Sequence, residues 1–122
     1  MTKTTKTTKT TQPAPAKALR ARALALPGAW EDDPWGDSVV KVAKKIFVFL
    51  GEKKVTLKLV EAHAAAMSVP GAVPTPYGLG KAGWVTLPLD GAPPLDVLGD
   101  WLEESYRLVA PKKLIKELDA RG

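Results

Sequence analysis

PGAWEDDPWGDSVVKVAKKIFVFL, residues 27–50, is the stretch around which the rest of the chain is organised. It begins with an acidic segment that contains two tryptophans, and we interpret residues 29–37 as a loop. Two apolar segments follow at 38–43 and 46–50. They predict a β-hairpin, because short runs rich in Val, Ile and Phe are typical of strands. A pair of lysines lies at the junction between them.

Period-two alternation assigns the faces of this hairpin. In the first strand Val40 and Val42 share one face, and the other face carries Val39, Lys41 and Ala43. In the second strand one face is aliphatic and the other aromatic: Ile46, Val48 and Leu50 oppose Phe47 and Phe49. Because both faces of this second strand are apolar, we expect a central strand that is covered on two sides.

The elements outside the hairpin alternate between helical and extended patterns. Helices are predicted at 15–26, 61–67, 95–109 and 112–118, further strands at 55–59 and 84–89, and a proline-rich edge segment at 68–77. The long helix has the clearest apolar stripe, and its acidic and basic residues suit the helix dipole. This order predicts an α+β fold, a mostly antiparallel β-sheet packed by N- and C-terminal helices.

The 122 residues are enough for one ordinary domain, which we expect to span residues 14–119. The first residues read MTKTTKTTKTTQ, a low-complexity repeat with almost nothing to bury. We therefore predict a disordered tail over residues 1–13. It is either a basic arm that contacts polyanions or a solubilising extension, and four lysines spread over residues 1–17 favour the extension.

Composition excludes several classes of function. The net charge of +5 comes mainly from the tail, so the body is close to neutral. There is no cysteine and one histidine, His63, which excludes thiolate sites and multi-histidine metal sites. No apolar run approaches the ~20 residues that a membrane span needs. No secretory signal is recognisable, so we expect a cytoplasmic protein that is not bound to a membrane.

No motif points to catalysis, a cofactor or a metal. Acidic residues crowd into the predicted loop, but their spacing is not that of a calcium-binding loop and a solvated acidic loop explains them better. Gly78, Gly80 and Gly83 have the GxGxxG spacing, yet a predicted strand follows where a phosphate site needs a helix. His63, Ser105 and Tyr106 lie on different predicted elements or pack within a helix interface, so we expect no enzyme.

The candidate binding residues are basic and aromatic side chains at exposed strand positions and turns. They are Lys41, Lys44, Lys45, Lys58, Lys81 and Trp84. Gathered on one surface, they would contact DNA phosphates and stack on a base. The other interpretation is that lysines protect exposed strands against aggregation. The near-neutral body favours this second interpretation. We expect Trp30 and Trp35 to cover the edge of the core instead of stacking on bases.

Short segments in a characteristic order resemble one family. In the first half they are Leu26-Pro27-Gly28, Trp35-Gly36, Val40-Lys41-Val42, Lys45-Ile46-Phe47 and Lys58. In the second half they are Tyr77, Lys81, Trp84-Val85, Ser105-Tyr106, Leu108-Val109 and Lys112-Lys113-Leu114. Over roughly residues 17–118 the chain resembles the MmcQ/YjbR family, whose fold is similar to the CyaY (frataxin-like) fold. The departures are Val60-Glu61, where the family usually has Asp-Pro, and the KTT tail.

The resemblance implies a DNA-binding protein and does not imply an active site. We expect a non-enzymatic monomer without a cofactor. The resemblance gives the DNA interpretation of the lysines a weight comparable to that of the protective one. The alternative is a module that binds a protein partner or a small ligand in a cleft between the acidic loop and the long helix. A broad apolar patch around Trp35 and Trp101 would favour this alternative. Iron handling, the function suggested by the likeness to frataxin, is disfavoured, because the first helix carries Lys17, Arg20 and Arg22 and no acid.

Overall fold

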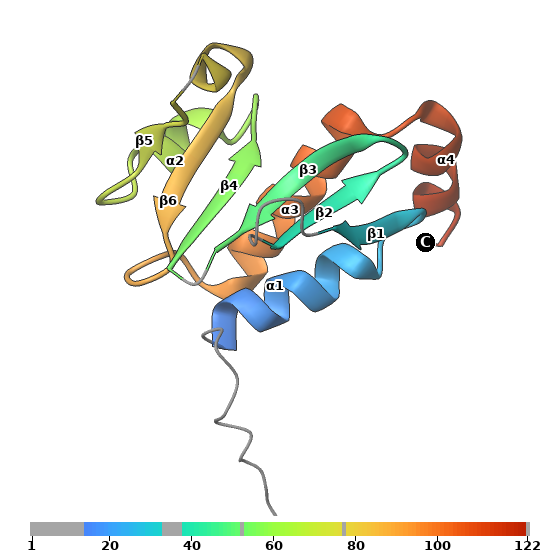
Figure 1. Ribbon diagram of the computed structural model, residues 1–122, viewed down its shortest axis with the longest axis horizontal. Coiled ribbons are helices and arrows are strands. Elements are labelled where there is room, and N and C mark those ends of the chain that lie inside the picture. Colours follow the sequence, from blue (N-terminus) through green and yellow to red (C-terminus); the bar gives the residue numbers. More distant parts are fainter. Residues whose placement is uncertain (1–13, 33–37, 52, 77, 122) are drawn as a thin grey trace, which may run out of the picture.

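The computed structural model describes residues 14–32, 38–51, 53–76 and 78–121. Its centre is an antiparallel sheet with the strand order β1-β2-β3-β4-β6-β5 (Figure 1). The strands are β1 (Ala29–Asp32), β2 (Ser38–Val42), β3 (Lys45–Leu50), β4 (Lys54–Lys58), β5 (Val73–Pro74) and β6 (Trp84–Pro88). The helices are α1 (Ala14–Leu24), α2 (His63–Met67), the short 3-10 helix η2 (Leu79–Ala82), α3 (Leu95–Val109) and α4 (Lys112–Ala120). The expected α+β fold is confirmed.

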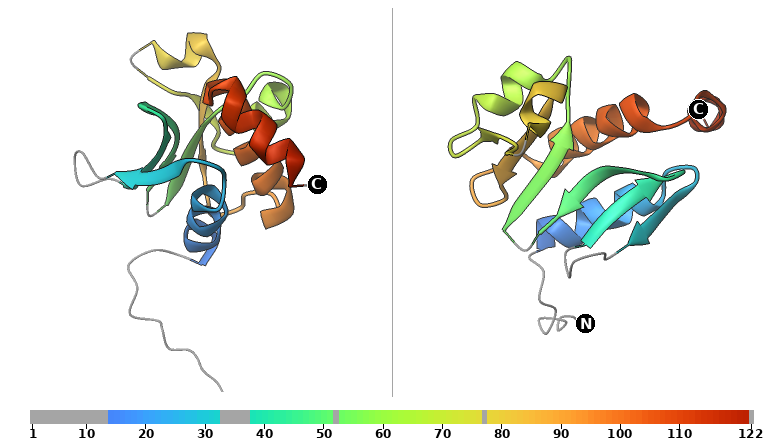
Figure 2. Two further views of the ribbon diagram at one scale, coloured as in Figure 1. Left: turned by 90° about the vertical axis from the view of Figure 1, so that its right-hand side faces the viewer. Right: turned by 45° about the horizontal axis from the view of Figure 1, so that its top comes forward.

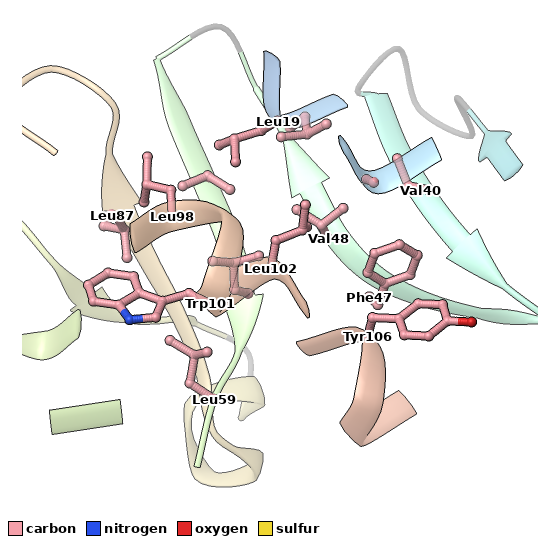
Figure 3. Close-up of a cluster of buried hydrophobic side chains, with 14 of the residues drawn as sticks. Leu19, Val40, Phe47, Val48, Leu59, Leu87, Leu98, Trp101, Leu102 and Tyr106 are labelled. Atoms are coloured by element: carbon pink, nitrogen blue, oxygen red, sulfur yellow. The ribbon is translucent and has the colours of Figure 1, made fainter. Parts of the chain in front are cut away.

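Helices α1 and α3 contact each other and lie on the same side of the sheet (Figure 2). Leu19 of α1 and Leu98 and Leu102 of α3 pack there against the inward side chains of the central strands (Figure 3). These strand residues are Val40, Val42, Val48, Leu50, Val55, Leu57, Val85 and Leu87. The other face of the sheet is called the helix-free face below. We predicted that β3 is covered on both sides. In the described part of the chain, helices cover only one side of β3, so this prediction is wrong.

A β-bulge changes the faces of β3. The pairing of β2 with β3 shifts between Val40 and Lys41, so that Val40 lies opposite Val48 and Lys41 opposite Ile46. Phe47 is the extra residue, and a bulge lets two consecutive residues point to one side. Phe47 is fully buried against Tyr106, with ring centroids 5.3 Å apart (Figure 3). Alternation had placed Ile46 on the face of Val48 and Leu50, and Phe47 on the face of Phe49, and both assignments are wrong.

Residues 29–32 form the edge strand β1 and not the start of a loop. Its four residues pair with β2 in a regular antiparallel register from Ala29 opposite Val42 to Asp32 opposite Val39. Ala-Trp-Glu-Asp has low intrinsic strand preference, so the neighbouring strand and not the local sequence stabilises this conformation. Residues 33–37, the rest of the predicted loop, lie outside the described residues, as does the predicted tail at 1–13.

Strands β3 and β4 pair along only part of their length and then diverge (Figure 1). Their register ends at Val48 opposite Leu57. Beyond that point Ser105 of α3 replaces the missing ladder bonds. Its hydroxyl donates to the carbonyl of Phe47 at 2.5 Å and accepts the backbone N–H of Lys58 at 2.9 Å. The buried serine thus holds the diverging strands at a fixed separation.

Among the described residues, no helix is both long and apolar enough to cross a bilayer.

Candidate nucleic-acid interface

The strand register defines which side chains share the helix-free face, because partners across antiparallel strands lie on the same side. Trp30 and Lys41 are opposite each other, as are Lys41 and Ile46, Phe49 and Thr56, Thr56 and Thr86, and Lys58 and Trp84. Asp32, Val39, Lys54 and Pro88 belong to the same face by alternation. By register, Asp32 is the only acid among the described residues of this face.

All six candidate residues lie toward one end of the sheet, where β2 ends, β3 begins, β4 ends and β6 begins. The divergence of β3 from β4 separates them into two groups. We call Trp30, Lys41, Lys44 and Lys45 the turn group, because they surround the β2–β3 turn. We call Lys58, Lys81 and Trp84 the β6 group, because they surround the start of β6. The predicted residues therefore share one end but do not form one contiguous cluster.

The turn group is built around an anchored indole. Trp30 keeps 44% of its surface exposed, and its Nε1–H donates to the carbonyl of Ala43 at 3.0 Å. The Nζ of Lys41 lies 5.2 Å from the centroid of the Trp30 ring, within range of a cation–π interaction. The same Nζ pairs with Asp32 at 2.7 Å. Lys41 therefore holds Trp30 in place, and only 20% of its own side chain is exposed.

The backbone at the turn has an uncommon conformation that supports this arrangement. Ala43 has a φ of 55°, in the left-handed region where a side chain costs about 1 kcal/mol or more. Its carbonyl is the acceptor for Trp30. Lys44 follows in the turn and is exposed. Lys45 is exposed too, but it lies opposite Val42 and so on the helix-covered side of the sheet.

The β6 group is built around Trp84. The ring of Trp84 contacts Phe49 edge to face, with centroids 5.7 Å apart and an interplanar angle of 73°. Lys58 lies directly opposite Trp84 on β4 and is half-buried. Lys81 is exposed on η2, three residues before Trp84. An aromatic pair with Lys58 beside it thus occupies this part of the helix-free face, and Lys81 lies close by in the sequence.

Gly83 determines how β6 begins. Its φ is +99°, and a Cβ at this position would lie 2.7 Å from the carbonyl oxygen of Leu59. The carbonyl of Gly83 also accepts the N–H of Leu59 at 2.9 Å. Glu104 of α3 fixes the chain just beyond, where its carboxylate accepts the N–H groups of Val60 and Glu61 at 2.7 Å. The ends of β4 and β6 are therefore firmly positioned.

The acidic residues of the predicted loop have protein partners. Arg20 binds Glu31 with two hydrogen bonds, the Nε bond being 2.7 Å long, and Ser38 donates to the same carboxylate at 2.6 Å. These bonds hold the pKa of Glu31 below its usual value, and the bond from Arg20 contributes more than the bond from Ser38. Asp32 pairs with Lys41. Within the described ranges, no three acidic or histidine side chains are grouped to hold a metal, while Asp33 and Asp37 lie outside these ranges.

Sequence reasoning missed the two residues that complete the aromatic surface. We predicted that Trp30 covers the core edge, but it is exposed on the helix-free face, so that prediction is wrong. Phe49 was not selected because its strand seemed apolar on both sides. Once β1 is recognised as a strand, the alternation of Trp30 and Asp32 with Ala29 and Glu31 is a signal that would have found Trp30.

The remaining aromatic and hydroxyl candidates serve the interior or lie outside the described ranges. Trp101 is only 8% exposed and belongs to the core (Figure 3), so it cannot contribute to an exposed binding patch. Trp35 and Tyr77 lie outside the described residues. The hydroxyl of Ser105 donates to the carbonyl of Phe47, and the hydroxyl of Tyr106 donates to the carbonyl of Pro27 at 2.6 Å. These bonds confirm that both residues serve the interface between α3 and its neighbours.

Comparisons with known proteins fit this architecture. A family model described as YjbR matches residues 24–108, a range that contains every candidate residue. The crystal structure of Deinococcus radiodurans protein DR2400, with the family-model domain DUF419, is similar to this chain with a TM-score of 0.67 and 28% sequence identity. That likeness covers 84% of this chain and 86% of the other. Among curated proteins, none matches the sequence.

Proposed function

Because the chain belongs to the YjbR family, and because its helix-free face combines lysines with aromatic rings, we propose that it is a non-enzymatic protein that binds DNA through this face. Lysines supply the attraction to phosphates, which accounts for most of the affinity in such complexes. Aromatic and apolar side chains beside them offer contact to sugars and bases. Both kinds of side chain are present in the turn group and in the β6 group.

One observation carries the proposal: the strand register pairs each indole with a lysine on the neighbouring strand, on one face and at one end of the sheet. Trp30 lies opposite Lys41, and Trp84 lies opposite Lys58. Lysines that merely protect strands from aggregation would be expected mainly on edge strands. Lys41 is on β2, where it pairs with Trp30 of β1 on one side and with Ile46 of β3 on the other, so protection of an edge does not explain it.

A charge-matched pair of triple variants tests the proposal. The first is Lys44→Ala/Lys58→Ala/Lys81→Ala, which removes exposed or half-buried lysines from both groups. The control is Lys112→Ala/Lys113→Ala/Lys116→Ala on α4, which removes the same charge from the helix side of the molecule. Binding is measured by the fluorescence anisotropy of labelled DNA, single-stranded and duplex, over a salt series from low to physiological concentration.

The proposal expects salt-dependent binding of the unaltered protein that weakens in the first variant and persists in the control. On duplex DNA, the slope of log affinity against log salt becomes shallower by about 0.9 for each phosphate that the variant no longer neutralises. Absence of binding to either DNA at low salt would refute the proposal. Equal weakening in both variants would show that only net charge matters and that the helix-free face has no special role.

A further inference from the structure

We infer that the helix-free face is a stacking surface for single-stranded DNA, with Trp30 and Trp84 each taking one unpaired base. This inference rests on the proposed function and specifies the form of DNA. Trp30 was not among the candidate binding residues predicted from the sequence, which were five lysines and Trp84. It is nevertheless the most exposed aromatic side chain described in the structure.

The fixed orientation of Trp30 is the first argument. An exposed indole on an edge strand normally has rotamer freedom, which it loses when a ligand binds. Here the bond from Nε1 to Ala43 and the position of the Lys41 ammonium over the ring restrict the side chain before any ligand is bound. The strained φ of Ala43 belongs to the same arrangement. A restricted aromatic surface loses less entropy on binding and so binds more tightly.

The arrangement of Trp84 is the second argument. Its ring is held edge to face by Phe49, and Lys58 lies opposite it across the strand pair. The β6 group therefore repeats the chemistry of the turn group, in which a held indole adjoins a lysine. Two such units on one face fit a ligand that repeats an anionic group and a flat ring along its length, as a polynucleotide does.

The state of the bases decides between single strands and duplex. In a duplex both faces of each base are stacked on neighbouring bases, so an indole can reach them only after unstacking, which costs a few kcal/mol per step. In a single strand the base faces are accessible. The helix-free face carries its rings on strands, and among the described residues no helix lies on this side to enter a major groove. Single-stranded DNA therefore gains stacking that duplex DNA cannot provide.

The test compares a labelled dT15 strand with a duplex of the same length, using the full-length protein. We expect the single strand to bind at least tenfold more tightly. Substituting either indole, as Trp30→Ala or Trp84→Ala, should weaken dT15 binding by about 5- to 150-fold, the range for removal of one stacked base. Duplex binding should change little. Leu108→Ala, which removes an exposed apolar side chain from α3, is the matched control and should retain affinity.

A conservative variant and a measurement of size complete the design. Trp30→Phe keeps an aromatic face and should retain most of the affinity for dT15, even if Trp30→Ala perturbs the edge strand. If duplex and single strand bind equally, or if Trp30→Ala binds dT15 as well as the unaltered protein does, the inference is wrong while the proposed function stands. If light scattering shows a dimer that Trp30→Ala dissociates, the face joins two copies of the chain, and the inference is overturned. Failure of both DNA forms to bind removes the proposed function and the inference together.

Discussion

The two faces of the sheet are made by the same strands but differ in composition and in what they contact. The helix-covered face is mainly apolar, and its centre is buried beneath α1 and α3. The helix-free face mixes lysines, threonines and aromatic rings, many of them half-buried. Because alternate residues of one strand serve different faces, substitutions at adjacent positions should have separate effects. Those on the covered face should change stability, and those on the helix-free face should change binding.

The largest expected difference is between two adjacent residues, Phe47 and Ile46. Phe47→Ala should lower the free energy of unfolding by about 3–5 kcal/mol, because it removes a fully buried ring that packs on Tyr106. Ile46→Ala should cost much less, since this half-buried side chain lies on the helix-free face. Urea unfolding followed by circular dichroism measures both values.

This pair tests the bulge directly. Without the bulge, simple alternation would bury Ile46 and expose Phe47, and the two costs would be reversed. A larger cost for Ile46→Ala than for Phe47→Ala would therefore show that the register shift between Val40 and Lys41 is not present in solution.

The second prediction concerns Ser105, which bonds to both diverging strands. Ser105→Ala should lower the free energy of unfolding by about 1–3 kcal/mol, because it leaves the carbonyl of Phe47 and the N–H of Lys58 without their partner. Ser68→Ala is the matched control. Its hydroxyl bonds only to a carbonyl in its own exposed turn, so a decrease of a few tenths of a kcal/mol is expected for an exposed site.

Hydrogen exchange shows whether the effect of Ser105→Ala is local. If Ser105 holds the divergence of β3 and β4, the N–H of Lys58 should exchange faster in Ser105→Ala than in the unaltered protein. The paired amide hydrogens around Val48 and Leu57 should change less, because ladder bonds protect them. Uniform acceleration across the sheet would mean that Ser105 contributes only to global stability.

The fold was predictable because its main elements have strong local patterns. The helix at Leu95–Val109 has a clear apolar stripe and the predicted bounds agree with the structure. The inward positions Val55, Leu57 and Leu59 follow strict alternation and are all buried. In both cases the residue periodicity of one element is sufficient, and no knowledge of its neighbours is needed.

The features that failed depend on pairing between segments. Whether β1 forms is decided by its ladder with β2, and the burial of Phe47 is decided by a bulge in the pairing of β2 with β3. Neither has a distinctive local signature. The candidate lysines were chosen for exposure at strands and turns, which alternation predicts, but the division into two groups follows from the divergence held by Ser105. Trp30 was misplaced because its strand was not recognised.

The smallest expected effect comes from the edge of the sheet, where Glu31 of β1 binds Arg20 of α1. The bonds from Arg20 and Ser38 lower the pKa of Glu31 in the folded protein, while the unfolded chain keeps a value near 4.5. The unfolded state then binds a proton first as the pH falls. The stabilisation is therefore complete above pH 4.5 and disappears as the pH falls through the lower pKa of the folded state. Because the side chain of Arg20 is 40% exposed and solvent screens the pair, the effect should not exceed about 1 kcal/mol.

Glu31→Gln should be less stable than the unaltered protein at pH 7 and should lose stability less steeply below pH 4.5 in a series of urea unfolding curves. Asp90→Asn, which alters an exposed carboxylate in a turn, should leave the acid limb unchanged. A Glu31→Gln variant with the same acid limb as the unaltered protein would show that this edge contact does not couple α1 to β1.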